Sequence, residues 1–182
     1  MSNADTTTRG RPDATIFQED IIRSPLARRV LAIGRIIIGF FFLWPFFDKL
    51  FGLGYATPNE AAWINGGAPA QGFINGIETP FASLFDLFAN PFGDVLFMAG
   101  LLGIGAAMLL GAGLRIAAVG WLVLMLFMWL AQLPWEIGGT NPVLTSHWVE
   151  GILLAIAAAT LSGDTWGLGR WWGRAVGNSF LR

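Results

Sequence analysis

Two short motifs hold the side chains of this 182-residue chain that could do chemistry. His147 and Glu150 are three residues apart, so on a helix they share one face. Asp48 and Lys49 are adjacent, so on a helix they point about 100° apart and cannot share one contact. Histidine is the side chain whose ordinary change of charge falls near neutral pH, which makes His147 a candidate proton carrier. We expect His147, Glu150 and Asp48 to be catalytic, and Lys49 to attract an anionic or quinone-type ligand.

A second group of candidates is expected to bind substrate or quinone. Its members are Lys49, Trp44, Gln132, Trp135, Glu136 and Arg35. Charged side chains are costly within hydrocarbon and are seldom idle there. Arg35 is expected about two turns inside the first apolar stretch, where it could snorkel to the headgroups or pair inside the protein. The other members lie near the opposite ends of the apolar stretches, so we expect them to converge with His147 in one polar pocket.

Three interpretations of this pocket stay open from the residues alone. A metal site would use His147, Glu150 and a further carboxylate, which is a weak signature for a metal. A structural cluster would pair Lys49 with Asp48 or Glu150 near the headgroups. A redox site would let His147 exchange protons with a quinone in an apolar slot. The chain has no Cys and one His, so neither a covalent haem nor an iron–sulfur cluster is expected, and no metal is implied.

Four apolar stretches must position these residues. They are expected at about residues 27–51, 91–110, 114–133 and 143–161. The chain is 54% hydrophobic and only 13% charged, and each stretch approaches the roughly 20 residues that span a bilayer. In the hydrocarbon core of a bilayer, a chain that does not form a closed barrel can hydrogen-bond all of its backbone groups only as a helix. The predicted fold class is therefore all-α, an integral membrane four-helix bundle.

Short signals predict where these helices begin, end and pack. Asn90 and Pro91 are typical of a helix start, and residues 111–113 (Gly-Ala-Gly) of a helix end with a tight turn. Small residues recur at four-residue spacing, which lets helix backbones approach one another. They are Ala99, Gly103, Ala107 and Gly111 in the second stretch and Gly151, Ala155 and Ala159 in the fourth. We expect them to pack within one chain rather than to form a dimer.

The distribution of basic residues predicts the topology. Of the 11 Lys and Arg residues, all except Lys49 fall on one side of the membrane that the four stretches define. Short loops keep Lys and Arg in the cytoplasm, so both termini are expected inside. The protein is thus predicted to be multi-pass in the plasma membrane (the bacterial inner membrane). The loop at residues 52–90, which has no basic residue, is expected outside.

Three regions follow from this topology. Residues 1–26 are predicted to be a disordered tail that ends in an interfacial piece around residues 16–22. Residues 27–162 form the predicted membrane domain, and residues 163–182 an interfacial cytoplasmic tail. In the outer loop, aromatic and apolar residues at helical spacing after Pro80 predict a short helix. The net charge of −1 gives no sign of a nucleic-acid partner.

Several of these pieces resemble the DoxX family of DoxX/DoxD-like four-helix membrane proteins. Members of that family carry an arginine early in helix one and an Asp-Lys pair at its end. The resemblance covers about residues 30–172. It is carried by Arg35, by Asp48-Lys49 and the glycines up to Gly54, by residues 63–67, by residues 113–115, by Asn141-Pro142 with His147, and by residues 163–169.

The resemblance implies a plasma-membrane bundle related to a subunit of a thiosulfate:quinone oxidoreductase. We therefore expect a membrane subunit of a redox or electron-transfer system, with a sulfur anion outside and quinone as the cofactor in the bilayer. The alternative is a non-catalytic membrane scaffold or accessory subunit that recruits partner proteins through its outer loop. The expected partners are the lipid bilayer, partner subunits or a second copy of the chain, and a small anionic substrate or quinone.

Overall fold

The computed structural model describes residues 14–131 and 146–182, and within them the chain is helical and forms no strand. The long helices are α2 (Pro25–Phe51), α5 (Pro91–Leu110), α6 (Leu114–Leu130) and α7 (Ser146–Ala159). The shorter helices are α1 (Gln18–Ile21), α3 (Gln71–Ile74), α4 (Ala82–Asp86) and α8 (Gly169–Val176). Single 3-10 turns are η1 (Asn59–Ala61), η2 (Trp63–Asn65) and η3 (Ser162–Asp164). The all-α class is confirmed, and α4 is the short helix predicted in the outer loop.

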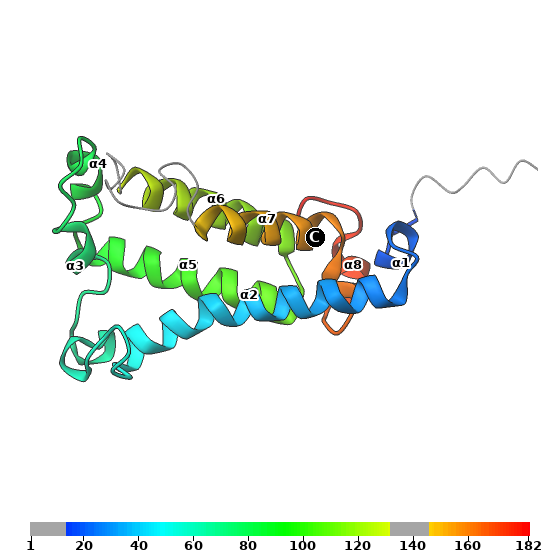
Figure 1. The fold of residues 1–182 in the computed structure, drawn as a ribbon, viewed down its shortest axis with the longest axis horizontal. Helices are drawn as coiled ribbons and strands as arrows, with labels where there is room; N and C mark the ends of the chain where they lie inside the picture. The colour runs from blue at the N-terminus through cyan, green and yellow to red at the C-terminus, as the bar shows by residue number, and fades with distance from the viewer. Residues whose placement is uncertain (1–13, 132–145) are drawn as a thin grey trace, which may run out of the picture.

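The long helices pack in two layers (Figure 1). α2 lies beside α5 and α6 lies beside α7, while α5 also contacts α6 and α2 also contacts α7. The two layers separate toward the end of the molecule that carries α3 and α4, whereas α1 and α8 lie at the opposite end. α3 and α4 therefore cover the end at which the sequence predicted a polar pocket.

One core runs along the inward faces of the long helices. Its buried side chains come from all of them and include Ile38, Met98, Trp121 and Leu154. A smaller cluster joins α3 and α4 around Phe85. Core side chains of this kind fix the rotation of each helix, and that rotation decides which polar residues can meet.

α2 and α5 approach each other closely at a pair of glycines. A Cβ atom on Gly39 would lie 2.7 Å from the backbone nitrogen of Leu109, and one on Gly105 would lie 2.9 Å from that of Leu43. Neither position therefore has room for a side chain. The predicted small-residue register of this stretch is wrong in its outer half, because a Cβ atom on Gly103 would have no neighbour within 4 Å.

The predicted boundaries of α5 are confirmed. The Asn90 side chain accepts hydrogen bonds from the backbone N–H groups of Phe92 and Gly93 at 3.0 and 3.2 Å. The helix ends at Gly111, whose φ of 74° is the left-handed conformation that glycine adopts without strain. Because the turn to α6 is short, α5 and α6 form the predicted antiparallel hairpin.

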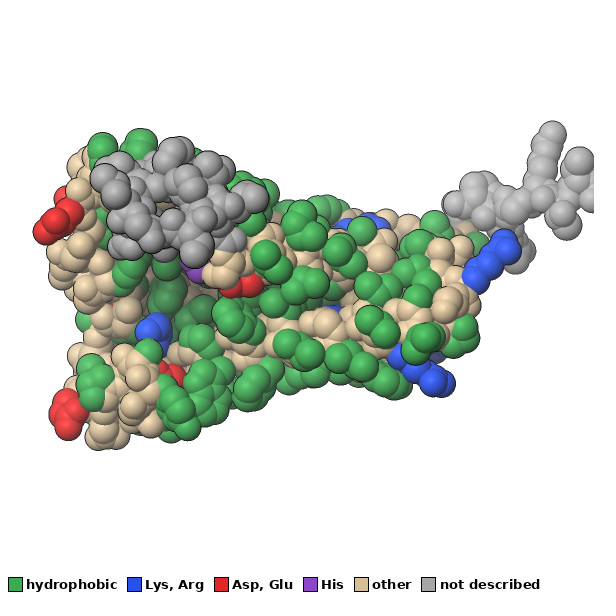
Figure 2. Space-filling model, viewed as in Figure 1, with side chains coloured by type: hydrophobic (Ala, Val, Ile, Leu, Met, Phe, Trp, Pro, Cys, Tyr) green, Lys and Arg blue, Asp and Glu red, His purple; other side chains and the backbone are tan. Residues whose placement is uncertain are grey.

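Two helices, α2 and α5, are long and apolar enough to cross a membrane. α6 and α7 are shorter apolar helices of 17 and 14 residues, and the part of their predicted stretches in residues 132–145 lies outside the described residues. Large apolar side chains are exposed along all of these helices, as at Ile37, Leu96, Leu122 and Ile152. Figure 2 shows such side chains covering the flank of the molecule. Soluble monomers rarely expose so much apolar surface, so these features indicate a membrane protein.

The first and last described segments lie together beside η3. The buried Arg182 and Asp164 side chains form an ion pair at 2.9 Å. Asp164 also accepts a hydrogen bond at 2.8 Å from the backbone N–H of Gln18, a residue with no exposed surface. The piece predicted around residues 16–22 is therefore a single helical turn that packs against the C-terminal segment.

Candidate functional site

Asp48 fastens the end of α2 to the loop that follows it. Its carboxylate is buried and accepts hydrogen bonds from the backbone N–H groups of Tyr55 and Ala56 at 3.2 and 3.0 Å. Each carboxylate oxygen is thereby used by the main chain of the loop. Among the described residues Asp48 makes no ion pair. The geometry gives this residue a positioning role, and its predicted catalytic role stays a prediction.

Arg35 is buried near the other end of α2, where it does not snorkel. Arg35 is only 1% exposed. Its guanidinium donates hydrogen bonds to the backbone carbonyls of Met108, Leu109, Thr165 and Trp166. Two of these carbonyls belong to the last turn of α5, where a helix leaves carbonyls unpaired and carries partial negative charge. The snorkelling expectation is therefore wrong, because the main chain of the protein itself binds this cation.

His147 and Glu150 lie near the start of α7 and share a face, as their spacing predicted. His147 Nδ1 lies 3.5 Å from the Glu150 carboxylate. The histidine side chain is 26% exposed and the glutamate side chain 8%. A partly exposed imidazole beside a buried carboxylate can hold a proton and pass it to a neighbouring group.

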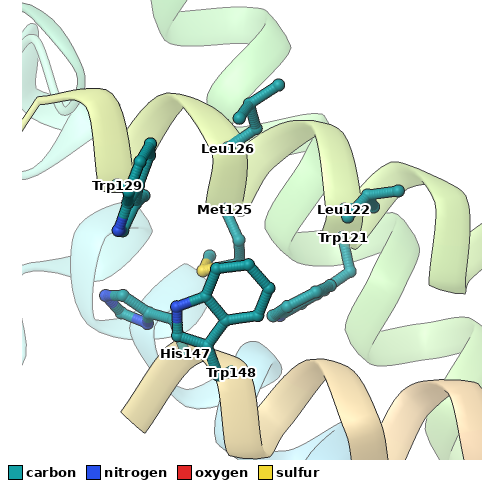
Figure 3. Close-up of a pocket in the computed structure, with 7 residues that line it drawn as sticks. All are labelled: Trp121, Leu122, Met125, Leu126, Trp129, His147 and Trp148. Atoms are coloured by element: carbon teal, nitrogen blue, oxygen red, sulfur yellow. The ribbon is translucent and has the colours of Figure 1, made fainter. Parts of the chain in front are cut away.

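A small apolar cavity lies between α6 and α7 beside this pair (Figure 3). We call it the tryptophan slot, and its volume is about 130 Å³. It is lined by Trp121, Leu122, Met125, Leu126, Trp129, His147 and Trp148. In Figure 3 the Trp148 indole reaches from α7 toward α6, with Trp121 on one side of it and His147 on the other. Because aromatic faces attract other rings, these walls suit a flat ring system.

Trp121 lines the tryptophan slot with its ring and carries an unsatisfied donor. Its indole N–H is buried and has no hydrogen-bond partner among the described residues. Leaving a buried donor unpaired costs about 1–3 kcal/mol. Gly151 of α7 seats the ring, since a Cβ atom at this glycine would collide with the indole. This member of the predicted small-residue register therefore packs within the chain.

Lys49 lines a second and larger cavity, which we call the lysine cavity. Its volume is about 690 Å³. Its walls come from the end of α2, from α3, from the aromatic residues of the α4 region, and from α5 and α6. Lys49 is the charged group among the described residues that line it. The tryptophan slot and the lysine cavity share no lining residue.

The structure does not line one cavity with all of the predicted residues that it describes. His147 and Glu150 lie beside the tryptophan slot, Lys49 lies in the lysine cavity, and Asp48 holds the loop. Arg35 binds carbonyls at the far end of α5. The described members of the predicted pocket therefore lie beside two cavities that share no lining residue.

Of the remaining predicted binding residues, the structure describes Trp44, which lines neither cavity. Trp44 lies on the exposed face of α2, where its ring is 5.0 Å from that of Tyr55. Gln132, Trp135 and Glu136 lie outside the described residues. Their roles stay predictions.

Asp94 is a buried acid that the sequence analysis missed. It lies in the first turn of α5 and accepts hydrogen bonds from the backbone N–H groups of Ala70 and Gln71 at 2.7 and 3.2 Å, and from the Gln71 side-chain amide. It thereby fastens α3 onto the end of α5. The signal was present, because Asp94 is the acidic residue inside the otherwise apolar stretch at residues 91–110.

The described residues thus offer an imidazole–carboxylate pair beside an apolar slot, and one amine inside a larger apolar cavity. Within residues 14–131 and 146–182, no group of three or more His, Cys, Asp or Glu side chains could hold a metal ion. The chain was compared with protein-family models, with curated proteins and with solved structures, and none of them matches it.

Proposed function

We propose that this chain is the quinone-binding subunit of a membrane redox system, of the kind found in the DoxX-like proteins that its sequence resembles. The observation that carries the proposal is the His147–Glu150 pair beside the tryptophan slot. A bound quinone would supply two-electron chemistry that takes up and releases protons, so its site needs a protonatable side chain at an apolar surface.

The tryptophan slot suits a quinone ring in size and lining. Its volume of about 130 Å³ is close to the ~150 Å³ of an engineered apolar cavity that binds benzene. Leu122 and Leu126, which are more than half exposed, lie at the slot and would leave it open to lipid, where the tail of a quinone lies.

The two polar residues have different roles in this proposal. His147 exchanges the proton, because its Nε2 nitrogen is not occupied by Glu150. The Glu150 carboxylate orients the imidazole and stabilises it when it is protonated. The electrons come from a partner subunit or from a sulfur anion outside, as the resemblance implies.

The proposal also places α2, α5, α6 and α7 across the bacterial plasma membrane, with both ends of the chain in the cytoplasm. Three features support this arrangement: the apolar flank of the molecule, the contacts that join all of these helices, and the basic residues gathered at the α1–α8 end. Basic residues of this kind stay on the cytoplasmic side.

A photoreactive quinone analogue tests the binding site directly. The purified full-length chain in nanodiscs would be irradiated with the analogue, with and without excess decylubiquinone, and the labelled peptides mapped. We expect protectable labelling of α6 and α7 that falls about tenfold in His147→Ala, a loss of roughly 1.4 kcal/mol of binding. Ile152→Ala, on the exposed face of the same helix, is the matched control and should label as the unchanged protein does.

A second readout separates binding from turnover. Membranes that contain the chain and its partners would be assayed for thiosulfate-dependent quinone reduction, which Glu150→Gln should slow. Labelling that maps elsewhere, together with unchanged reduction in both variants, would contradict the proposal. The chain would then be better described as a non-catalytic scaffold.

A further inference from the structure

The lysine cavity is separate from the proposed quinone site. Trp121 and Met125 of α6 face the tryptophan slot, whereas Leu124 and Phe127 of the same helix line the lysine cavity. The two cavities therefore use different faces of α6. An inference about the lysine cavity does not rest on the proposed quinone chemistry; it shares only the proposed placement in the membrane.

Glycine positions on two helices open this cavity. Gly100 of α5 and Gly120 of α6 both line it. A Cβ atom on Gly100 would have no neighbour within 4 Å, and one on Gly120 would meet a single side-chain atom at 3.9 Å. Side chains at these positions would reach into the space that is now open. The volume of about 690 Å³ is in the range of small-molecule sites in proteins, about 300–1,000 Å³.

The other described residues that line the lysine cavity are apolar, and those of α3 and the α4 region cover one end of it. Phe73 and Ile74 of α3 and Phe85 and Phe88 of the α4 region line the cavity beneath the loop. Figure 2 shows a hollow at this end of the molecule, with hydrophobic side chains inside it and charged side chains around it. A hydrocarbon chain fits such walls, because burial of each methylene group is favourable.

Lys49 adds one positive charge to this apolar wall. Its amine makes no ion pair and donates no hydrogen bond to any residue in the part of the chain that the structure describes. Asp48 and Asp94 accept hydrogen bonds from backbone N–H groups, and neither of them forms an ion pair with Lys49. A cation that is partly removed from water and has no partner attracts an anion.

We propose that the lysine cavity binds an anionic single-chain lipid, with the carboxylate of a long-chain fatty acid paired to Lys49 and the alkyl chain between α5 and α6. The charge and the apolar volume each select one half of such a molecule. Lys49 lies two residues from the end of α2, at the depth where a membrane amphiphile carries its headgroup.

Binding of tritiated palmitate to the full-length chain in zwitterionic nanodiscs tests this site, with empty nanodiscs subtracted. Saturable binding is expected for the unchanged protein. Lys49→Met keeps the length of the side chain but removes its charge, and it should weaken palmitate binding about tenfold. Lys49→Arg keeps the charge, so its affinity for palmitate should stay within about threefold of that of the unchanged protein. Gly100→Leu, which fills the cavity, should weaken binding at least about tenfold.

Gly103→Leu is the matched control for the cavity-filling variant. Gly103 also has open space at its Cβ position, but it does not line the cavity, so this variant should bind palmitate as the unchanged protein does. Circular dichroism would confirm that both variants keep their helix content. Equal loss in Gly103→Leu and Gly100→Leu, or no loss in Gly100→Leu, would overturn the assignment of the site.

Two competitors test the chemistry of the ligand. Methyl palmitate has the same chain without the charge, and it should compete at least about tenfold less well than palmitate with the unchanged protein. In the Lys49→Met variant, methyl palmitate and palmitate should compete equally well. If the ester competes as well as the acid in the unchanged protein, the anionic headgroup is wrong. If decylubiquinone displaces palmitate more effectively than palmitate itself does, the cavity belongs to quinone and the proposal fails.

Discussion

Arg35 and Asp48 lie on one helix about 20 Å apart, at a rise of about 1.5 Å per residue, and each binds a different piece of backbone. Arg35 satisfies carbonyls at the end of α5 and after η3, and Asp48 satisfies N–H groups of the following loop. Such main-chain groups have no partners of their own where a helix ends or a loop turns. A charge buried in an apolar protein is likewise costly without partners. Both residues are therefore expected to determine stability more than turnover.

Replacing Arg35 by methionine should lower the thermal unfolding temperature of the purified protein strongly. The variant keeps the volume of the side chain but leaves several buried carbonyls unpaired, which corresponds to a loss of about 3 kcal/mol. Arg115→Met is the control, because Arg115 is only half-buried and donates one hydrogen bond, to the carbonyl of Ser179 at 3.0 Å. We expect a loss below about 1 kcal/mol there. Equal unfolding temperatures for the two variants would contradict the assigned role.

Asp48→Asn separates a positioning role from a catalytic one. The amide keeps one acceptor oxygen, so one of the two N–H bonds from Tyr55 and Ala56 is lost, at a cost of about 1–2 kcal/mol. Hydrogen exchange at these two amides should become faster. Labelling by the quinone analogue should stay unchanged. Abolished labelling with unchanged hydrogen exchange would show that Asp48 acts at the ligand instead.

The types of the important residues were easier to predict than their meeting points. That His147 and Glu150 share a face follows from the period of a helix alone. Depth along the bundle also follows from the sequence, which is why Lys49 was placed at the correct end. The rotation of each helix about its axis depends on packing partners distant in sequence. For that reason Lys49 and His147 were predicted in one pocket, although they line different cavities.

At the scale of elements, the contact between α2 and α5 depends on Gly39 and Gly105. Gly39→Leu should destabilise the protein by about 3 kcal/mol or more, because the obstructing atoms belong to the backbone of α5 and cannot move aside. Gly103→Leu on the open face of α5 should change the unfolding temperature little. The measurement is thermal unfolding followed by circular dichroism. An unchanged unfolding temperature in Gly39→Leu would mean that the helices pack elsewhere.

The sequence predicted the ends of α5 better than its faces. Asn90 and Gly111 act on their own local backbone, so their effect could be predicted without any partner. The small-residue register through Gly103 needed the position of α2, which the sequence does not contain. Asp94 was missed for the same reason, since its partners in α3 are more than twenty residues away.

The ion pair between Glu19 of α1 and Arg170 of α8 should stabilise the protein less in acid. A backbone hydrogen bond and then the Arg170 guanidinium lower the pKa of Glu19 below its usual 4.5. A lowered pKa means that the stabilisation is present above pH 4.5 and is lost as the pH falls through the folded value. The Glu19 side chain is 38% exposed, so the effect stays below about 1 kcal/mol. The difference in unfolding temperature between the unchanged protein and Glu19→Gln should therefore disappear in acid; a difference that persists there would contradict this.

At the scale of the whole molecule, charged side chains gather near the two ends of the protein, and apolar side chains cover the flank between them. In Figure 2 most basic side chains lie toward the α1–α8 end and most acidic ones toward the α3–α4 end, although one basic side chain lies beside the hollow there; hydrophobic side chains cover the flank. α5 has 20 residues and so is about 30 Å long, which matches the hydrocarbon core of a bilayer. The described ends of the chain both lie on the basic side, as expected if the bundle crosses the membrane an even number of times.

The chain has no cysteine, so single cysteines report topology without a background. Asn75→Cys in the outer loop and Ser179→Cys near the C-terminal end are both at exposed positions. In spheroplasts, a membrane-impermeant maleimide should label the first and should label the second only after lysis. This pair tests the orientation, and the opposite pattern would reverse it.

Ser146→Cys decides how many helices cross the membrane, because Ser146 is exposed at the start of α7. If α6 and α7 span the bilayer with α2 and α5, this cysteine lies outside and is labelled in intact spheroplasts. If only α2 and α5 span it, the chain stays inside after α5 and the cysteine is labelled only after lysis. We expect labelling from outside, because α6 and α7 complete the ring of contacts and expose large apolar side chains along their length.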